Sequence, residues 1–274
     1  MSSHPTPARG NVLPKYIGEV PRVRMTDRDV GRDFDKVSVV YDETRQPLDA
    51  ETIGGFERFL HEHAWTSILE VGVGTGRILR PLAERGFRAF GVDVSQGMLA
   101  RASTKGLPFL VRATAYHLPF RDRSLDAVLF AHVLHLLDDP AAGLREAARV
   151  SRGGILAIMD RPNERPEKDT PRAIVGRILA EEGFPEVLRP GPLSKEREIL
   201  AAHPPKEVRT LSDRDVTEPL SEQLDRIEKR AYRHVLDVPP DVLDRAVAAA
   251  RARVGDRTVT YRRTEAVVWW PPVE

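Results

Sequence analysis

Three glycines at alternate positions constrain the fold of this chain more than any other feature of its sequence. Gly72, Gly74 and Gly76 follow the apolar run 67–71 (SILEV) and precede a segment with helical spacing, 78–85. Glycines at such a strand-to-helix junction let the backbone turn sharply and approach a ligand closely, while the amides at the helix start face a negative group. The three glycines predict a ligand-binding loop in an α/β domain. A tight turn without a ligand is the simpler alternative.

Apolar runs and helical spacing alternate along most of the chain after residue 50. The apolar runs are 67–71, 88–94, 108–113, 125–131 and 153–160, and helical spacing covers 78–85, 96–104 and 141–150. Strands rich in Val, Ile and Leu that alternate with helices form parallel sheets covered on both faces. We therefore expect an α/β fold with a doubly wound, mostly parallel sheet, and a helical lid insertion after the fifth strand.

This pattern divides the chain into four expected segments. Residues 1–33 are rich in Pro and Arg without periodicity and form an N-terminal arm, and 34–162 form the ligand-binding core. Residues 163–256 form a helical lid or substrate region, with helices expected at 171–182, 219–236 and 240–254. Residues 257–274 are β-branched and aromatic, so we expect terminal strands that complete the core sheet.

Composition excludes several classes of protein. The 42 Lys and Arg residues nearly balance the 41 Asp and Glu residues, so no basic excess indicates a nucleic-acid partner. The chain has no cysteine, which excludes disulfides and thiolate metal sites and fits the cytoplasm. The most apolar long stretch, 127–137, is too short to span a bilayer. No His/Asp/Glu group has metal-ligand spacing, so we expect no metal.

Residues around the loop indicate what the ligand carries. A dinucleotide-binding G-x-G-x-x-G pattern needs a glycine at the position of Arg77. Asp93 ends the second apolar run, 21 residues beyond Gly72, where a carboxylate can accept both hydroxyls of a ribose. The spacing favours a ligand with a ribose over a nicotinamide dinucleotide, so an oxidoreductase is the disfavoured alternative.

Four motifs in order resemble one enzyme family. ILEVGVGTGR (68–77), GVDVS (91–95), ATAYHLPF (113–120) and LDAVLFAHVLHLLDDP (125–140) are similar to class I methyltransferases that use S-adenosylmethionine. The closest branch acts on small molecules and includes ubiquinone and menaquinone biosynthesis enzymes. The resemblance implies a Rossmann-like core, S-adenosylhomocysteine as product, and in-line transfer of a methyl group to oxygen, carbon or nitrogen. The alternative is a protein that binds S-adenosylmethionine as a structural or regulatory ligand without methylating.

The resemblance also implies cofactor-binding residues. Glu70 lies near the methionine ammonium, the loop residues line the methionine part, and Asp93 holds the ribose. The other implied contacts, mostly on the adenine side, are Arg77, Val94, Met98, Thr114, Ala115 and Ala131. The family usually has an acid where Thr114 stands, and a hydroxyl accepts a hydrogen bond less strongly.

Each of these roles has a simpler alternative that the sequence leaves open. Glu70 can be a solvated strand end, and Asp93 can cap a helix, although Ser95 is the better cap. Met98 can be core packing, and Thr114 can be a turn residue.

Candidates for catalysis lie where ligands bind in open α/β sheets, beyond the carboxyl ends of the strands. His132 directly follows the fourth apolar run and is the candidate base; a histidine that only packs is the alternative. Tyr41, in the upstream segment YDETR, can face the methyl group or form a surface pair with Arg45. We expect a small-molecule substrate and a monomer or homodimer.

Overall fold

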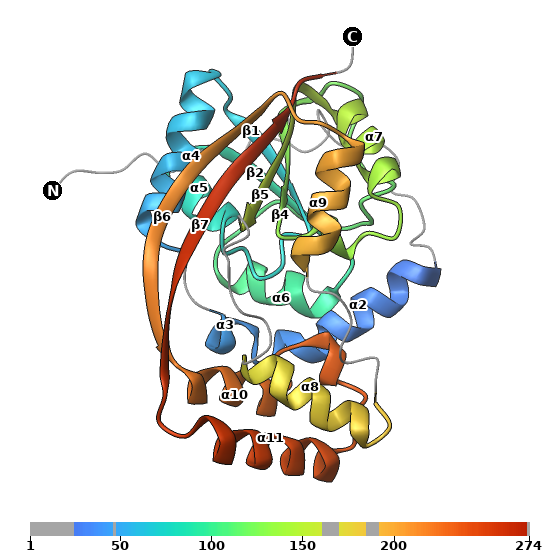
Figure 1. Cartoon of the computed structure of the whole chain (residues 1–274). Coiled ribbons are helices and arrows are strands. Elements are labelled where there is room, and N and C mark those ends of the chain that lie inside the picture. Colours follow the sequence, from blue (N-terminus) through green and yellow to red (C-terminus); the bar gives the residue numbers. More distant parts are fainter. Residues whose placement is uncertain (1–24, 46–47, 161–169, 185–191, 273–274) are drawn as a thin grey trace, which may run out of the picture.

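A seven-stranded sheet forms the centre of the molecule in the computed structural model, which describes residues 25–45, 48–160, 170–184 and 192–272 (Figure 1). The strands are β1 (Ser67–Val71), β2 (Arg88–Asp93), β3 (Leu110–Arg112), β4 (Leu125–Ala131), β5 (Ser151–Asp160), β6 (Glu207–Pro219) and β7 (Thr258–Trp270). Their order is β3-β2-β1-β4-β5-β7-β6. The first five are parallel, and β7 runs antiparallel to both β5 and β6. The expected doubly wound, mostly parallel sheet is confirmed.

Helices cover the sheet and form a second unit below it in Figure 1. They are α2 (Met25–Ser38), α3 (Tyr41–Thr44), α4 (Ala50–Glu62), α5 (Leu79–Glu84), α6 (Gln96–Thr104), α7 (Pro140–Val150), α8 (Pro171–Glu181), α9 (Pro192–Ala202), α10 (Leu220–Glu228) and α11 (Pro240–Val254), with 3-10 turns η1 (Leu134–Leu136) and η4 (Arg233–Val235). None of the helices in the described ranges is long and apolar enough to cross a membrane.

The central strands β1 and β4 are buried at every position because both faces of the sheet are covered. Along β4, Val128 and Phe130 pack into the core that includes residues of α7 and α9. Ala127, Leu129 and Ala131 point the other way, into the core that α4 and α5 cover. A period of two in side-chain direction therefore gives one continuous apolar run, as expected for a buried parallel strand.

The expectation that 163–256 is a helical insertion is wrong at β6. This strand pairs with β7 along its whole length, from Glu207 opposite Trp269 to Pro219 opposite Thr258. Its sequence, EVRTLSDRDVTEP, alternates charged with less polar residues, because one face of this edge strand is exposed. The expected terminal strands at 257–274 are one strand, β7, which completes the sheet between β5 and β6.

The remaining helices of this segment form a unit of their own. Helices α8, α10 and α11 share an apolar core that contains Val175, Leu224 and Val247. The helix expected at 219–236 is interrupted at Arg230, whose backbone is left-handed (φ 54°). Its guanidinium donates to the carbonyls of residues 235, 236 and 238 and so closes the turn that leads into η4. We call α8, α10, η4 and α11 the helical unit.

The N-terminal boundary also differs from expectation. Residues 25–33, assigned to an arm, belong to α2, while 1–24 lie outside the described residues. Asp35 of α2 accepts hydrogen bonds from Ser95 Oγ (2.6 Å) and Gly97 N (2.7 Å), which fixes α2 to the start of α6. The folded part therefore begins before residue 34, and the many charges of α2 hide this from sequence analysis.

Candidate cofactor and acceptor site

The glycine loop lies where the strand order reverses, between β1 and β4. Gly72, Gly74 and Gly76 all have positive φ angles (73°, 55° and 81°). The amides of Gly72 and Val73 both donate to the carbonyl of Val92, at 2.8 and 2.9 Å, so the loop is held against the end of β2. Ligands of open α/β sheets bind at such reversal points, beyond the carboxyl ends of the strands.

We expect Gly72→Ala to lower the melting temperature and to weaken ligand binding at least tenfold. The left-handed backbone costs an alanine about 1 kcal/mol, and its Cβ would lie 2.5 Å from Val133 Cγ2. Gly86→Ala is the matched control, because Gly86 also has a positive φ (91°) but has nothing within 4 Å of the added Cβ. Thermal unfolding and calorimetric titration compare the two variants, and equal losses would contradict a special role for the loop.

Asp93 connects the glycine loop to the start of α6. One carboxylate oxygen accepts from Gly74 N and the other from Ser95 N, each at 2.8 Å. Burial raises the pKa of Asp93 to about 6, and the amide bonds from Ser95 and Gly74 oppose the increase. Ser95 caps α6, since its Oγ accepts from Met98 N. Asp93 is therefore not the N-cap, and its carboxylate lies at the loop.

Glu70 is a buried acid in the middle of the sheet. Only 3% of it is exposed, and among the described residues its Oε2 has no hydrogen-bond partner. Burial raises its pKa to about 8; the charge of Asp93 adds to the shift, while the Leu79 amide and Arg77 oppose it. Glu70 is thus not a solvated strand end. A buried carboxyl group with an unsatisfied oxygen at a ligand-binding loop suits a positively charged ligand group.

The structure brings Glu70, Arg77, Asp93 and the loop together, and the backbone amide of Val94 also bonds to the Asp93 carboxylate. The other expected cofactor residues are buried or half-buried near strand ends: Val94, Met98, Thr114, Ala115 and Ala131. Thr114 lies in a turn, where its carbonyl accepts from His117 N at 3.2 Å. The amide of Ala113 donates to the carbonyl of Asp93 at 3.1 Å, which places this turn beside the end of β2.

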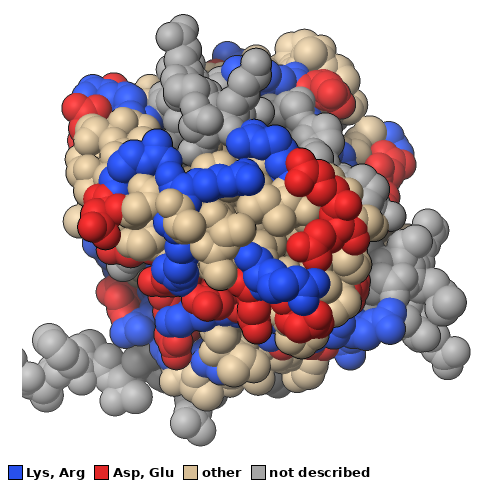
Figure 2. Space-filling view, turned by 60° about the horizontal axis from the view of Figure 1, so that its bottom comes forward, with Lys and Arg blue, Asp and Glu red and all other residues tan. Residues whose placement is uncertain are grey.

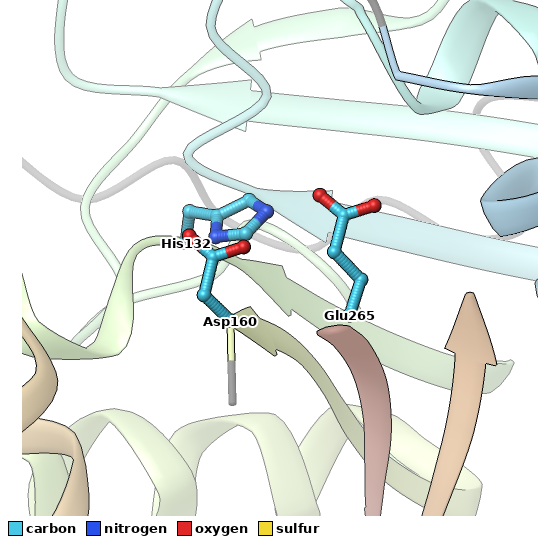
Figure 3. A group of neighbouring side chains, drawn as sticks. All are labelled: His132, Asp160 and Glu265. Carbon is cyan, nitrogen blue, oxygen red and sulfur yellow. The ribbon is translucent and has the colours of Figure 1, made fainter. Parts of the chain in front are cut away.

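His132 follows β4 in a strained backbone conformation. Its φ is 54°, in the left-handed region that costs a non-glycine residue about 1 kcal/mol or more, and its amide donates to Ile158 at 3.0 Å. Beside it lie Asp160 at the end of β5 and Glu265 in β7, and their ligand-type atoms lie within 4.8 Å of one another (Figure 3). The sequence spacing gave no sign of such a group, so the reason for expecting no metal does not hold.

Two further contacts fix Glu265, which is 1% exposed. Thr52 Oγ1 donates to its Oε2, and Arg263 Nη2 lies 2.7 Å from its Oε1. Arg263 Nε also lies 3.7 Å from Asp160 Oδ1. Sequence analysis missed Glu265 and Arg263, because only the sheet order places β7 beside the end of β5.

Tyr41 and its neighbours connect the glycine loop to the helical unit. Asp42 accepts from Thr75 Oγ1 at 2.6 Å. The Arg45 guanidinium lies 5.0 Å from the ring centroids of both Tyr41 and Tyr232, and it donates to the carbonyl of Ala231. The Tyr41 ring thus packs against Arg45, both side chains are half-buried, and α3 lies between the loop and the helical unit.

The arrangement first defines a class of protein. A parallel sheet with a glycine loop at its reversal point, a buried Asp after β2 and a buried Glu in β1 defines an α/β protein that binds a nucleoside-type ligand.

Comparisons with known proteins give the family. Residues 69–158 match the model of the methyltransferase domain family. Demethylmenaquinone methyltransferase of Corynebacterium urealyticum is 37% identical over 138 residues, which are 48% of this chain and 60% of that enzyme. The chain thus spans about 60% of the length of the curated relatives it matches. These matches confirm the resemblance of residues 69–158 to class I S-adenosylmethionine-dependent methyltransferase domains, including those of quinone biosynthesis.

Solved structures share the fold. A methyltransferase from an antibiotic biosynthesis pathway of Anabaena variabilis matches with a TM-score of 0.56 and 18% identity, over 81% of this chain and 98% of that one. Phosphoethanolamine N-methyltransferase 2 of Haemonchus contortus, solved with S-adenosylhomocysteine, matches with a TM-score of 0.52 and 18% identity, over 92% of this chain and 61% of that one.

Proposed function

We propose that this protein transfers a methyl group from S-adenosylmethionine to a small molecule. The observation that carries the proposal is a glycine loop that donates to buried Asp93 and directly follows the strand of buried Glu70. In the reaction the bond between sulfur and the methyl carbon breaks, its electron pair stays on sulfur, and S-adenosylhomocysteine leaves. The sulfonium is already activated, so the protein mainly aligns the acceptor and excludes water.

The cofactor would extend from β1 across the end of β2. In this proposal Glu70 pairs with the methionine ammonium, the loop from Gly72 through Gly74 to Arg77 lines the methionine part, and Asp93 accepts both ribose hydroxyls. The proposed adenine contacts are Val94, Met98, Thr114 and Ala115, and Ala131 lies on the methyl side. The unsatisfied oxygen of Glu70 supports its contact with the ammonium. The hydrogen bond that Asp93 accepts from the Gly74 amide supports its position beside the ribose.

The acceptor would lie between the ends of β4 and β5 and the helical unit. We propose that His132 promotes loss of the acceptor's proton and that Tyr41 lines the same space. Contacts of the helical unit with α2 and α3 support a role as lid: Arg233 Nη2 pairs with Asp33 at 2.9 Å, and Arg45 reaches Ala231. The lid would be the helical unit of α8, α10, η4 and α11.

The surface favours a small molecule over nucleic acid. Figure 2 shows basic and acidic side chains intermixed on the face that it presents, and the formal net charge is only +1. Nucleic-acid binding relies on a basic surface. We further propose a cytoplasmic enzyme, in keeping with the absence of cysteine, that is a monomer or homodimer.

The test combines binding with transfer. Purified protein is titrated with S-adenosylmethionine, S-adenosylhomocysteine and NAD, and methyl transfer is then measured from labelled S-adenosylmethionine to a panel that begins with naphthoquinols, because of the demethylmenaquinone methyltransferase relatives. We expect binding of the two sulfur nucleosides and not of NAD. Binding of NAD alone would overturn the proposal.

His132→Ala is expected to separate transfer from cofactor binding. We expect the turnover of an accepted substrate to fall about 10²-fold or more, while the affinity for S-adenosylhomocysteine stays within a few-fold. His135→Asn is the control, since His135 lies three residues later and is bonded to Glu196 of α9 at 2.9 Å. Equal turnover of His132→Ala and wild type would exclude His132 from proton removal.

A further inference from the structure

We propose that His132, Asp160 and Glu265 bind a divalent metal ion on the acceptor side of the site. One imidazole and two carboxylates form a mixed nitrogen and oxygen ligand set, which suits Mn²⁺ or Zn²⁺. The binding site follows from this chain's own residues. The role of the ion in the reaction rests on the function proposed above.

The three side chains converge from the ends of β4 and β5 and from the middle of β7. Figure 3 shows the imidazole of His132 and the carboxylates of Asp160 and Glu265 turned toward a common space. Their ligand atoms lie within 4.8 Å of one another. Bonds of about 2.1 Å to a shared ion place ligand atoms about 3 to 4.2 Å apart, so shifts of well under 1 Å in the more exposed His132 and Asp160 suffice.

The separations fit an ion better than a hydrogen-bonded dyad. Within the described part of the chain, no hydrogen bond or ion pair joins the His132 ring to either carboxylate, although both are near. Asp160 Oδ1 is buried and has no hydrogen-bond partner among the described residues. A buried carboxylate oxygen left unsatisfied is unfavourable, and coordination of a cation would satisfy it.

Charge balance also leaves room for a cation. Arg263 contributes one positive charge, at 2.7 Å from Glu265 and 3.7 Å from Asp160, against two negative charges. Two carboxylates therefore share a single guanidinium group. Thr52 and Arg263 hold the Glu265 carboxylate in place, as partners beyond the first ligands do in metal sites, and carboxylate oxygens can accept further bonds.

Such an ion would determine which class of acceptor is methylated. A cation held by three protein ligands has free positions for a hydroxyl oxygen, and coordination makes that hydroxyl lose its proton to solvent more readily. The oxygen would then attack the methyl carbon as the bond to sulfur breaks. The acceptors expected are therefore phenols, quinols or other hydroxylated compounds, and His132 would promote proton loss as a ligand of the ion.

Direct titration of the metal tests the site without any acceptor. The full chain is treated with a chelator, and Mn²⁺ is added while the free ion is followed by electron paramagnetic resonance; Zn²⁺ is titrated calorimetrically. We expect one ion per chain, and at least tenfold weaker binding in His132→Ala and Asp160→Asn. His135→Asn, which removes a histidine bonded to Glu196 outside the cluster, should bind as wild type.

The outcomes separate this proposal from the proposed function. Absence of stoichiometric binding of either ion, or binding that survives both cluster substitutions, overturns the metal site. S-adenosylhomocysteine is titrated into the same samples: if it binds where no metal does, the proposed function stands and the metal site falls. The Asp160 side chain is 47% exposed, so Asp160→Asn should fold as wild type and keeps the test valid if His132→Ala impairs folding.

Discussion

Replacing Asp93 with alanine is expected to abolish the stabilisation that S-adenosylhomocysteine gives the wild-type protein. At 100 times its dissociation constant, a ligand stabilises the fold by about 2.7 kcal/mol. The substitution removes the proposed acceptor of both ribose hydroxyls and also the partner of the Gly74 amide. Hydrogen bonds to a charged group contribute about 1.5–3 kcal/mol each, so we expect binding at least 100-fold weaker. Thermal unfolding with and without ligand, together with calorimetry, measures the loss.

Asp93→Asn is the matched variant, because an amide keeps the size of the side chain and one accepting oxygen. It should bind more weakly than wild type and more tightly than Asp93→Ala. Asp122→Ala, at a carboxylate that pairs with Arg149 on the surface, should bind as wild type. If S-adenosylhomocysteine bound Asp93→Ala with wild-type affinity, Asp93 would not be the residue that holds the ribose. Because the pKa of Asp93 is raised to about 6 without ligand, affinity should also increase between pH 5 and 7.

Glu70→Gln is expected to stabilise the ligand-free protein at alkaline pH and to weaken cofactor binding. The pKa of Glu70 is raised to about 8 in the fold, from 4.5. The folded state therefore retains a proton that the unfolded state releases as pH rises above 4.5. Each pH unit between 4.5 and 8 then costs the folded wild type about 1.4 kcal/mol. Glutamine resembles the protonated acid, so the variant lacks this loss.

Unfolding in denaturant at pH 5 and pH 8.5 measures the effect. We expect wild type to lose more stability than Glu70→Gln between the two pH values, by several kcal/mol. Asp93→Asn serves as comparison. The pKa of Asp93 in wild type is raised to about 6, so removing this carboxyl group should change the pH dependence of stability only below about pH 6. With S-adenosylhomocysteine bound, wild type should become more stable than Glu70→Gln, because the ammonium of the ligand favours the ionised acid. If the free energy of unfolding depended on pH in the same way for wild type and Glu70→Gln, the pKa of Glu70 would not be raised in the fold.

The parallel half of the sheet could be predicted from the sequence because its determinants are local. Each of β1, β2, β4 and β5 is a short apolar run, and the loop residues Gly72 and Gly74 have the positive φ angles that their spacing indicates. Asp93 and Glu70 follow from the same segments. Their burial and raised pKa values do not, because these depend on strands from other parts of the chain.

Features that depend on the other half of the sheet escaped prediction. The charged alternation of β6 resembles a loop or a solvated helix until β7 is placed beside it. The helix expected through residue 236 ends because Arg230 adopts a left-handed backbone and its guanidinium bonds three carbonyls. The spacing of apolar residues does not predict this turn. His132, Asp160 and Glu265 are far apart in sequence, so only the strand order brings them together.

The position of β7 determines the order in which the sheet can be assembled. β6 comes before β7 in the chain but reaches the sheet only through it, since β7 separates β6 from β5. Until residues 258–270 have been synthesised, β5 and β6 each present an unpaired edge, and unpaired edges favour association with other chains. A chain that ends before β7 is therefore expected to associate with other chains through these edges.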